Sequence, residues 1–330
     1  PYELSNDQIA YFKENGFIKL KQVLSREVIE YMDLIITDEV NRLNKQQLAL
    51  EDRDTYGKAF LQIMNIWRNS DHVKEIIFGK RLAEIATNLL QVSGVRIYHD
   101  QALYKEPSGG HTPWHADQYY WPLDTDKTIT AWMPLQETPL DWGPLEFSAG
   151  SDQLVAGRDK EISDDSQSFL QEQLKSKGYP HLIEAFDLGE VSFHKGWLYH
   201  RAGPNKSNQM RKVMTIIYMD KDIKLKAPEN KNQQADWDAW CPGAVIGEVV
   251  DLAWYPDSSL FPKINDHGKW LNAMSQNTSI VFPAGILGID QKNTRAFNAV
   301  SNIIYNHSPS VNAITPDPIV AARIGLGSEV

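Results

Sequence analysis

The chain has 330 residues and a formal net charge of −10, which argues against a general binder of nucleic acid or anionic membranes because such proteins present a basic face. Apolar residues make up 42% and charged residues 23% of the chain, a composition that excludes a disordered protein and supplies a sizeable core. The single cysteine, Cys241, excludes an internal disulfide, a CxxC redox pair and a cysteine-based zinc site.

The first third of the chain is predicted to be mainly helical. Ser5 and Gln8 form a capping-box pattern, and Gly16 is expected to end the helix that they open. Apolar residues at helical spacing predict three further helices and are interpreted as core packing. The helices are expected over residues 5–16, 25–43, 71–78 and 81–90, with a short strand at 17–20. The start shows no basic region followed by an apolar core, so we expect no signal peptide and a cytoplasmic location.

From Gly94 the sequence changes to short β-prone segments separated by glycine and proline. The clearest lie at residues 95–104, 128–136, 145–147, 190–193 and 212–219. Several short strands with turn residues between them predict a sandwich, a barrel or a jelly roll. A charged insert at residues 158–177 interrupts the strands. It is expected to contain a helix from Asp164 and is a candidate lid over a site.

The segment TPWHAD at residues 112–117 carries the first chemical signal. On an extended backbone, side chains two residues apart point the same way, so His115 and Asp117 can meet at one point. Two histidines and one carboxylate with open positions are typical of non-haem Fe(II) oxygenases. Alone, the His-x-Asp pattern is also that of a surface turn with a hydrogen-bonded histidine.

A third ligand is available in His200, which ends a β-like segment just before a Gly-Pro turn. The long gap after Asp117 is expected if the ligands come from different strands of one barrel. Arg211 follows and opens the predicted strand at 212–219, where its guanidinium can clamp a carboxylate near the metal. The alternative for Arg211 is an ordinary strand-end arginine. The same three ligands also suit zinc, so a metallo-hydrolase is an alternative enzyme class.

Further motifs follow one another in order along the chain: LSNDQI through Phe12 to GFI at 4–18, YKEP at 104–107, TAWMPL at 130–135 and GPL at 143–145. Together with TPWHADQYYWP at 112–122, His200 and Arg211, they resemble the phytanoyl-CoA dioxygenase family of Fe(II)- and 2-oxoglutarate-dependent oxygenases, over about residues 4–262. The resemblance implies a mainly β fold with flanking α-helices. This fold is a double-stranded β-helix, a cupin-like jelly roll, with N-terminal helices.

The resemblance also implies roles for individual residues. His115, Asp117 and His200 would be the Fe(II) ligands, and no further catalytic residue is implied. Arg211 would bind the distal carboxylate of 2-oxoglutarate, which with O2 is a co-substrate. The other residues expected to line the co-substrate are Thr112, Lys105 and Trp132.

Two positions depart from the family pattern. The segment AGSD at 149–152 stands where the family often has Pro-Gly-Ser-His, and Ala202 stands where it often has a serine that helps to hold 2-oxoglutarate. One hydrogen bond to a charged carboxylate is worth about 1.5–3 kcal/mol, so the alanine predicts a weaker affinity for the co-substrate.

The implied activity is hydroxylation, or another oxidation, of an unactivated C–H bond of a small organic metabolite, with release of succinate and CO2. Desaturation, cyclisation or epimerisation at the same iron site is the alternative, and a catalytically silent binding barrel is a remoter one. Aromatic residues predict a pocket for an apolar, ring-bearing or cationic molecule. These candidate pocket residues are Tyr104, Trp114, Tyr119, Tyr120, Trp121 and Trp67.

Residues 1–262 are predicted to form the oxygenase domain, with the β-helix core at about 94–220, and residues 263–330 a C-terminal extension without an assigned role. The longest uncharged apolar stretch, residues 280–289, is interrupted by Pro283 and two glycines and is far shorter than the ~18 residues of a membrane span. We therefore expect a small-molecule substrate as the partner and neither nucleic acid nor membrane. The sequence predicts no oligomeric state.

Overall fold

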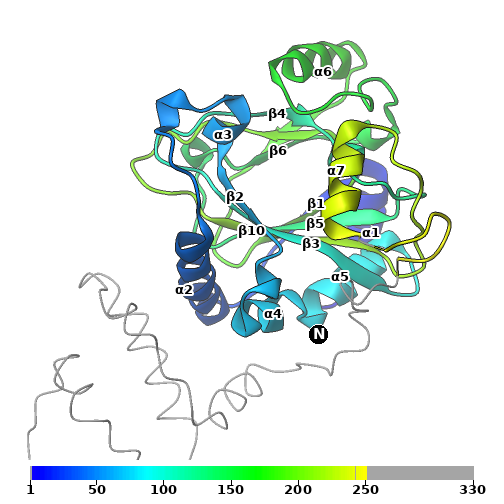
Figure 1. Ribbon diagram of the computed structural model, residues 1–330, viewed down its shortest axis with the longest axis horizontal. Coiled ribbons are helices and arrows are strands. Elements are labelled where there is room, and N and C mark those ends of the chain that lie inside the picture. The colour runs from blue at the N-terminus through cyan, green and yellow to red at the C-terminus, as the bar shows by residue number, and fades with distance from the viewer. Residues whose placement is uncertain (1, 242, 251–330) are drawn as a thin grey trace, which may run out of the picture. The chain divides into compact units, whose positions relative to one another are not determined.

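A computed structural model describes residues 2–241 and 243–250 of the chain (Figure 1). The predicted C-terminal extension, residues 263–330, lies outside the described residues. None of the helices within the described ranges is long and apolar enough to cross a membrane. The division of the chain into residues 1–262 and 263–330 stays a prediction.

The N-terminal helices form where the sequence predicts them. Ser5 caps α1 by accepting from the Gln8 amide, and Gly16 ends the helix in the left-handed conformation at φ +76°. The predicted helices are α1 (Asn6–Asn15), α2 (Arg26–Leu43), α4 (Asp71–Ile77) and α5 (Lys80–Leu90). The short elements near them are η1 (Leu50–Asp52), α3 (Thr55–Ala59) and η2 (Ile66–Arg68). Of the helices, α5 packs against three strands and covers a sheet face that would otherwise be exposed.

Two antiparallel sheets make up the body of the molecule. The larger sheet has the order β1-β8-β5-β10-β3-β2 and the smaller one β4-β9-β6-β7. In sheet order the strands of the larger sheet are β1 (Phe17–Leu20), β8 (Val191–Lys195), β5 (Thr128–Pro134), β10 (Val213–Asp220), β3 (Val95–Tyr104) and β2 (Leu61–Met64). Those of the smaller sheet are β4 (Thr112–His115), β9 (His200–Ala202), β6 (Leu145–Ser148) and β7 (His181–Ile183). Both sheets contribute residues to one cavity.

The predicted fold class, a mainly β jelly roll with flanking helices, is confirmed. Strands in the middle of the larger sheet are buried almost throughout, because helices cover one face and the cavity side chains pack on the other. The remaining elements connect strands or close the ends of the sheets: η3 (Asp117–Tyr120), η4 (Leu140–Trp142), η5 (Ser151–Gln153), α6 (Asp164–Ser176) and α7 (Lys231–Trp240).

Candidate active site

His115, Asp117 and His200, here called the triad, meet at one point. His115 ends β4 and His200 begins β9, and the two residues are direct partners in the antiparallel register. Their side chains therefore leave neighbouring strands on the same side, with ring centroids 4.2 Å apart. Asp117 Oδ1 lies 3.6 Å from Nε2 of each histidine. One donor atom from each of the three residues falls within 4.8 Å of the others, which is close enough to share one metal ion.

The backbone fixes the tautomer of both histidines. Nδ1 of His115 donates to the carbonyl of Pro113 at 2.7 Å, and Nδ1 of His200 donates to the carbonyl of Leu198 at 2.9 Å. A histidine that uses its Nδ1 proton in this way leaves Nε2 as a free lone pair. Both Nε2 atoms face Asp117, so the three donor atoms are preorganised to bind a cation.

The larger sheet holds the carboxylate of Asp117 in place. Its Oδ2 accepts from Thr130 Oγ1 at 3.0 Å and from His194 Nε2 at 3.3 Å. Thr130 and His194 are direct partners on β5 and β8, so one row of the sheet supplies both donors. This arrangement leaves Oδ1 for a metal and joins the two sheets at the triad.

The surroundings keep the triad in the protonation state that metals require. Burial lowers the pKa of His115 and His200 to about 4. Burial alone would raise the pKa of Asp117, but His200 and the hydrogen bond from His194 bring it below its usual range. At neutral pH the site therefore offers two neutral imidazoles and one carboxylate, and a divalent ion binds without displacing protons.

Arg211 lies in the cavity wall with its charge unpaired. Its side chain is 2% exposed, Nη1 donates to the Gly143 carbonyl at 2.5 Å, and Nε has no hydrogen-bond partner. Within the described part of the chain no carboxylate forms an ion pair with it, and burial lowers its pKa to about 9. A buried guanidinium with an open Nε matches a carboxylate supplied by a bound molecule.

The other residues predicted to line the co-substrate separate into two groups. Thr112 and Trp132 line the cavity, and the guanidinium of Arg211 lies 5.5 Å from the centre of the Trp132 ring. Lys105 does not line the cavity: its ammonium donates to the carbonyls of Gly110 at 2.6 Å and Gly203 at 2.8 Å. It also reaches Thr112 Oγ1 at 3.4 Å, which leaves the Thr112 hydroxyl proton available to the cavity.

Of the six aromatic residues predicted for the substrate pocket, Tyr120 and Trp121 line the cavity. The other four are not among the lining residues, although the Tyr119 hydroxyl accepts at 3.4 Å from Nδ2 of Asn232, which lines the cavity. The hydroxyl of Tyr104 bonds to Thr37 of α2, and Trp67 packs edge-on against Phe78. Trp114 packs with Leu170 and Tyr199 below α6. Tyr119 is buried, and its carbonyl accepts from Gln233 of α7 at 3.0 Å.

Residues near or on α3, β2, β3 and α7 that were not predicted from the sequence complete the cavity, which has a volume of about 320 Å³. Figure 1 shows α3 and α7 on opposite sides of the opening between the sheets. The added lining residues are Tyr56, Phe60, Gln62 and Met64 around α3 and β2, Gln101 and Leu103 on β3, and Asn232, Ala235, Asp236 and Trp240 on α7. The register explains the β3 residues, because Gln101 is the partner of Thr215 and Thr215 is the partner of Trp132 on the same face. No comparable sequence signal identifies the α7 residues, since the local sequence of a short polar helix does not indicate which part of the fold it packs against.

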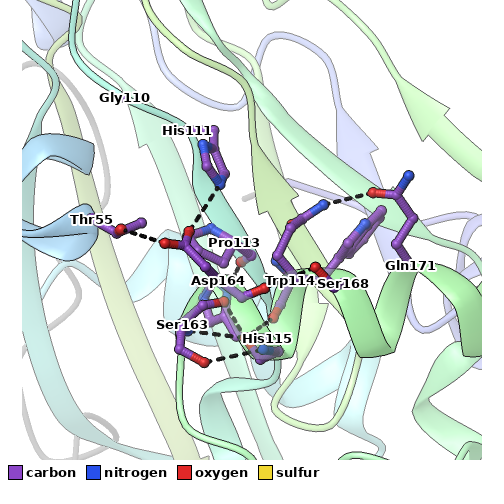
Figure 2. A network of polar contacts seen from close by, with 12 residues as sticks. Thr55, Gly110, His111, Pro113, Trp114, His115, Ser163, Asp164, Ser168 and Gln171 are labelled. Carbon is purple, nitrogen blue, oxygen red and sulfur yellow. Dashed lines mark hydrogen bonds and ion pairs between the residues drawn. The ribbon is translucent and has the colours of Figure 1, made fainter.

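The insert at 158–177 also borders the cavity. Ile162 lines it, and the Ile162 amide donates to the Tyr120 hydroxyl at 2.9 Å. Figure 2 shows Asp164, the first residue of α6, between Thr55 and His111: Thr55 Oγ1 donates to it at 3.0 Å, and His111 Nε2 lies 3.9 Å away. The insert thus contacts α3 and the loop before β4 through Asp164, the first residue of α6. Its opening and closing as a lid stays a prediction.

Comparison with known proteins gives a family. The family model described as phytanoyl-CoA dioxygenase (PhyH) matches residues 12–213. A curated relative from Stutzerimonas stutzeri, named a probable alpha-ketoglutarate-dependent hypophosphite dioxygenase, is 20% identical over 230 residues, which cover 66% of this chain and 79% of the relative. Alpha-ketoglutarate and 2-oxoglutarate are the same compound.

Solved structures share the fold. The non-heme alpha ketoglutarate dependent carbocyclase SnoK from nogalamycin biosynthesis is 19% identical, with a TM-score of 0.63 over 77% of this chain and 96% of its own. The epimerase SnoN, in complex with Fe3+, alpha ketoglutarate and nogalamycin RO, is 21% identical, with a TM-score of 0.63 over 76% of this chain and 97% of its own. EctD from S. alaskensis, with 2-oxoglutarate and 5-hydroxyectoine, is 18% identical, with a TM-score of 0.54 over 68% of this chain and 79% of its own.

Proposed function

Because this chain belongs to the phytanoyl-CoA dioxygenase family, we propose that its triad holds Fe(II) and that Arg211 binds the distal carboxylate of 2-oxoglutarate. The chain is a non-haem Fe(II)- and 2-oxoglutarate-dependent oxygenase. We propose that it hydroxylates, or otherwise oxidises, an unactivated C–H bond of a small organic metabolite, with release of succinate and CO2. A cytoplasmic location and an oxygenase domain over residues 1–262 belong to the same proposal.

One observation carries this function over a zinc hydrolase with the same ligands, namely the unpaired charge of Arg211. A zinc hydrolase needs only the metal and its bound water. In such an enzyme the buried guanidinium of Arg211 would therefore have no negative charge to pair with. A dicarboxylate co-substrate that reaches from the metal to Arg211 supplies that counter-charge. The open Nε and the Trp132 ring fit a planar carboxylate in this position.

The chain's own residues hold the metal ligands in place and bind the co-substrate. Thr130 and His194 hold one oxygen of Asp117, so the other keeps its direction toward the metal. Gly143 holds the Arg211 guanidinium through its carbonyl, and Thr112 offers a hydroxyl proton to the co-substrate. Bound Fe(II) and 2-oxoglutarate together supply the activation of dioxygen that C–H oxidation requires.

Incubation of the protein with Fe(II), 2-oxoglutarate, O2 and a library of small metabolites tests this function. Succinate release that requires all three reactants and rises with one library member is the expected result. The mass of the product then distinguishes the outcomes: hydroxylation adds one oxygen, desaturation or ring closure removes two hydrogens, and epimerisation leaves the mass unchanged. Metal-dependent turnover without O2 and 2-oxoglutarate would contradict the proposal.

A further inference from the structure

The cavity face of α7 carries one acidic side chain. Asn232, Asp236 and Trp240 line the cavity at four-residue spacing, so they lie along one face of the helix. This helix follows residue 213, where the match to the family model ends. Besides Asp117 of the triad, Asp236 is the only carboxylate among the described lining residues.

Two residues of β3 hold the Asp236 carboxylate, and Asn65 orients one of them. Oδ1 accepts from His99 Nε2 at 3.0 Å, and Oδ2 accepts from the Tyr98 hydroxyl. Asn65 fixes the histidine tautomer: its Oδ1 accepts from the Asp100 amide, so its Nδ2 donates to His99 Nδ1 at 3.1 Å. His99 is thus a neutral imidazole that donates through Nε2, and Asp236 receives two hydrogen bonds but no positive charge.

The negative charge of Asp236 is uncompensated where it meets the cavity. Across residues 2–241 and 243–250, no Lys or Arg nitrogen lies within ion-pair distance of it. Its side chain is 11% exposed, so the carboxylate is largely withdrawn from water and still reaches the cavity. A carboxylate in such a place is stabilised when a cation takes up the remaining lone pairs.

Aromatic rings surround this end of the cavity. Tyr120, Trp121 and Trp240 line the cavity and pack in one hydrophobic cluster with Tyr98. The guanidinium of Arg68 lies 5.6 Å from the centre of the Trp240 ring, so this ring already attracts a cation. Aromatic faces attract cations more strongly as water is removed. A carboxylate among tyrosine and tryptophan rings is the arrangement that recognises an ammonium group.

We propose that Asp236 anchors a cationic nitrogen group of the substrate, with Tyr120, Trp121 and Trp240 as its aromatic wall. This inference rests on the proposed function, because it assumes that the cavity beside the triad is the substrate site. Asp236 acts as a specificity-determining residue: it selects substrates that carry an ammonium group and orients them with the rest of the molecule toward the triad.

Binding of paired probes to the metal-free protein tests this proposal without turnover. Choline carries a quaternary ammonium, and 3,3-dimethylbutanol is its neutral carbon analogue. Calorimetry should show that choline binds the wild type more tightly than the neutral analogue does. The D236N substitution should lower the affinity for choline by at least about tenfold, which is the effect of losing one charge-assisted contact. D238N, an exposed acid on the same helix, is the matched control and should leave choline binding unchanged.

A second variant separates the charge from the attachment of α7. Y98F removes a hydrogen bond to Asp236 but keeps its charge, so this variant should still bind choline more tightly than the neutral analogue. Equal affinity of the wild type for both probes, no binding of choline, or equal choline affinity of D236N and wild type would each overturn the proposal. The absorption band of Fe(II) with 2-oxoglutarate should persist in D236N. Its absence from the wild type would refute the proposed function instead.

Discussion

At the scale of single residues, Arg211 should determine the affinity for 2-oxoglutarate. R211Q removes the charge and the paired N–H donors, so we expect the KM for 2-oxoglutarate to rise about 100-fold, which corresponds to ~2.7 kcal/mol. Fe(II) binding should not change, since Arg211 is not one of the triad residues. R26Q, at an exposed arginine on α2, is the control. An unchanged KM for 2-oxoglutarate in R211Q would show that Arg211 does not bind the co-substrate.

Ala202 offers the opposite experiment. It lines the cavity and is the register partner of Thr112 and of Leu145, at the level where the family often has a serine. A202S adds a hydroxyl that can donate to the bound carboxylate, so the Kd of 2-oxoglutarate should fall by about tenfold. Titration of the anaerobic Fe(II) protein with 2-oxoglutarate measures this change. An unchanged affinity in A202S would show that the co-substrate does not lie against this position.

At the scale of elements, the turn after η4 should be sensitive to substitution because Gly143 has a left-handed conformation and is crowded. Its φ is +68°, and a Cβ added there would lie 2.2 Å from the carbonyl oxygen of Gly203. G143A should lower the free energy of unfolding by ~3 kcal/mol and raise the KM for 2-oxoglutarate, since the displaced Gly143 carbonyl holds Arg211.

The control for this turn is G178A. Gly178 has a similar φ of +75°, but nothing lies within 4 Å of an added Cβ. Urea unfolding should show a loss of ~1 kcal/mol in G178A, the cost of the backbone conformation alone, with an unchanged KM. Equal losses in the two variants would contradict the crowding argument.

Asp100, which accepts hydrogen bonds from the start of η2, should make the free energy of unfolding of the protein depend on pH. It accepts from the amides of Ile66 and Trp67, and burial raises its pKa to about 7 although these bonds oppose the shift. Between pH 4 and pH 7 the folded state then binds a proton that the unfolded state has lost, so the free energy of unfolding falls as pH rises. The contribution is at most ~4 kcal/mol over this interval.

D100N lacks this titration and provides the comparison. Urea unfolding of the metal-free proteins at several pH values should give a stability curve that falls less steeply for D100N than for the wild type. Parallel curves for the two proteins would mean that Asp100 does not titrate in this range.

At the scale of the whole molecule, the sequence predicts five of the six strands of the larger sheet, because these are local apolar runs between glycine and proline, but only β6 of the smaller sheet. The strand predicted at 95–104 is β3, and the other five predicted strands agree with the structure within two residues at each end. The site depends on pairings that no local pattern records. Thr130 and His194 become partners of Asp117 only once β5 and β8 pair.

The alternation of side chains along strands could have corrected part of the predicted pocket. Since the side chain of His115 lines the cavity, its neighbour Trp114 on β4 points to the other side, where it packs against Leu170 of α6. Leu103 faces the cavity and Tyr104 next to it does not. Asp236 could not be found in this way, because the position of α7 is set by its contacts with η3 and β3 and not by its own sequence.

The most direct test of the account is anaerobic titration of the protein with Fe(II) and then 2-oxoglutarate, followed by visible absorption. The account predicts a chelate band that saturates at one Fe(II) and one 2-oxoglutarate per chain, is absent from H115A and H200A, and decays with release of succinate when O2 is admitted. No band in the wild type, together with no succinate in air, would contradict it.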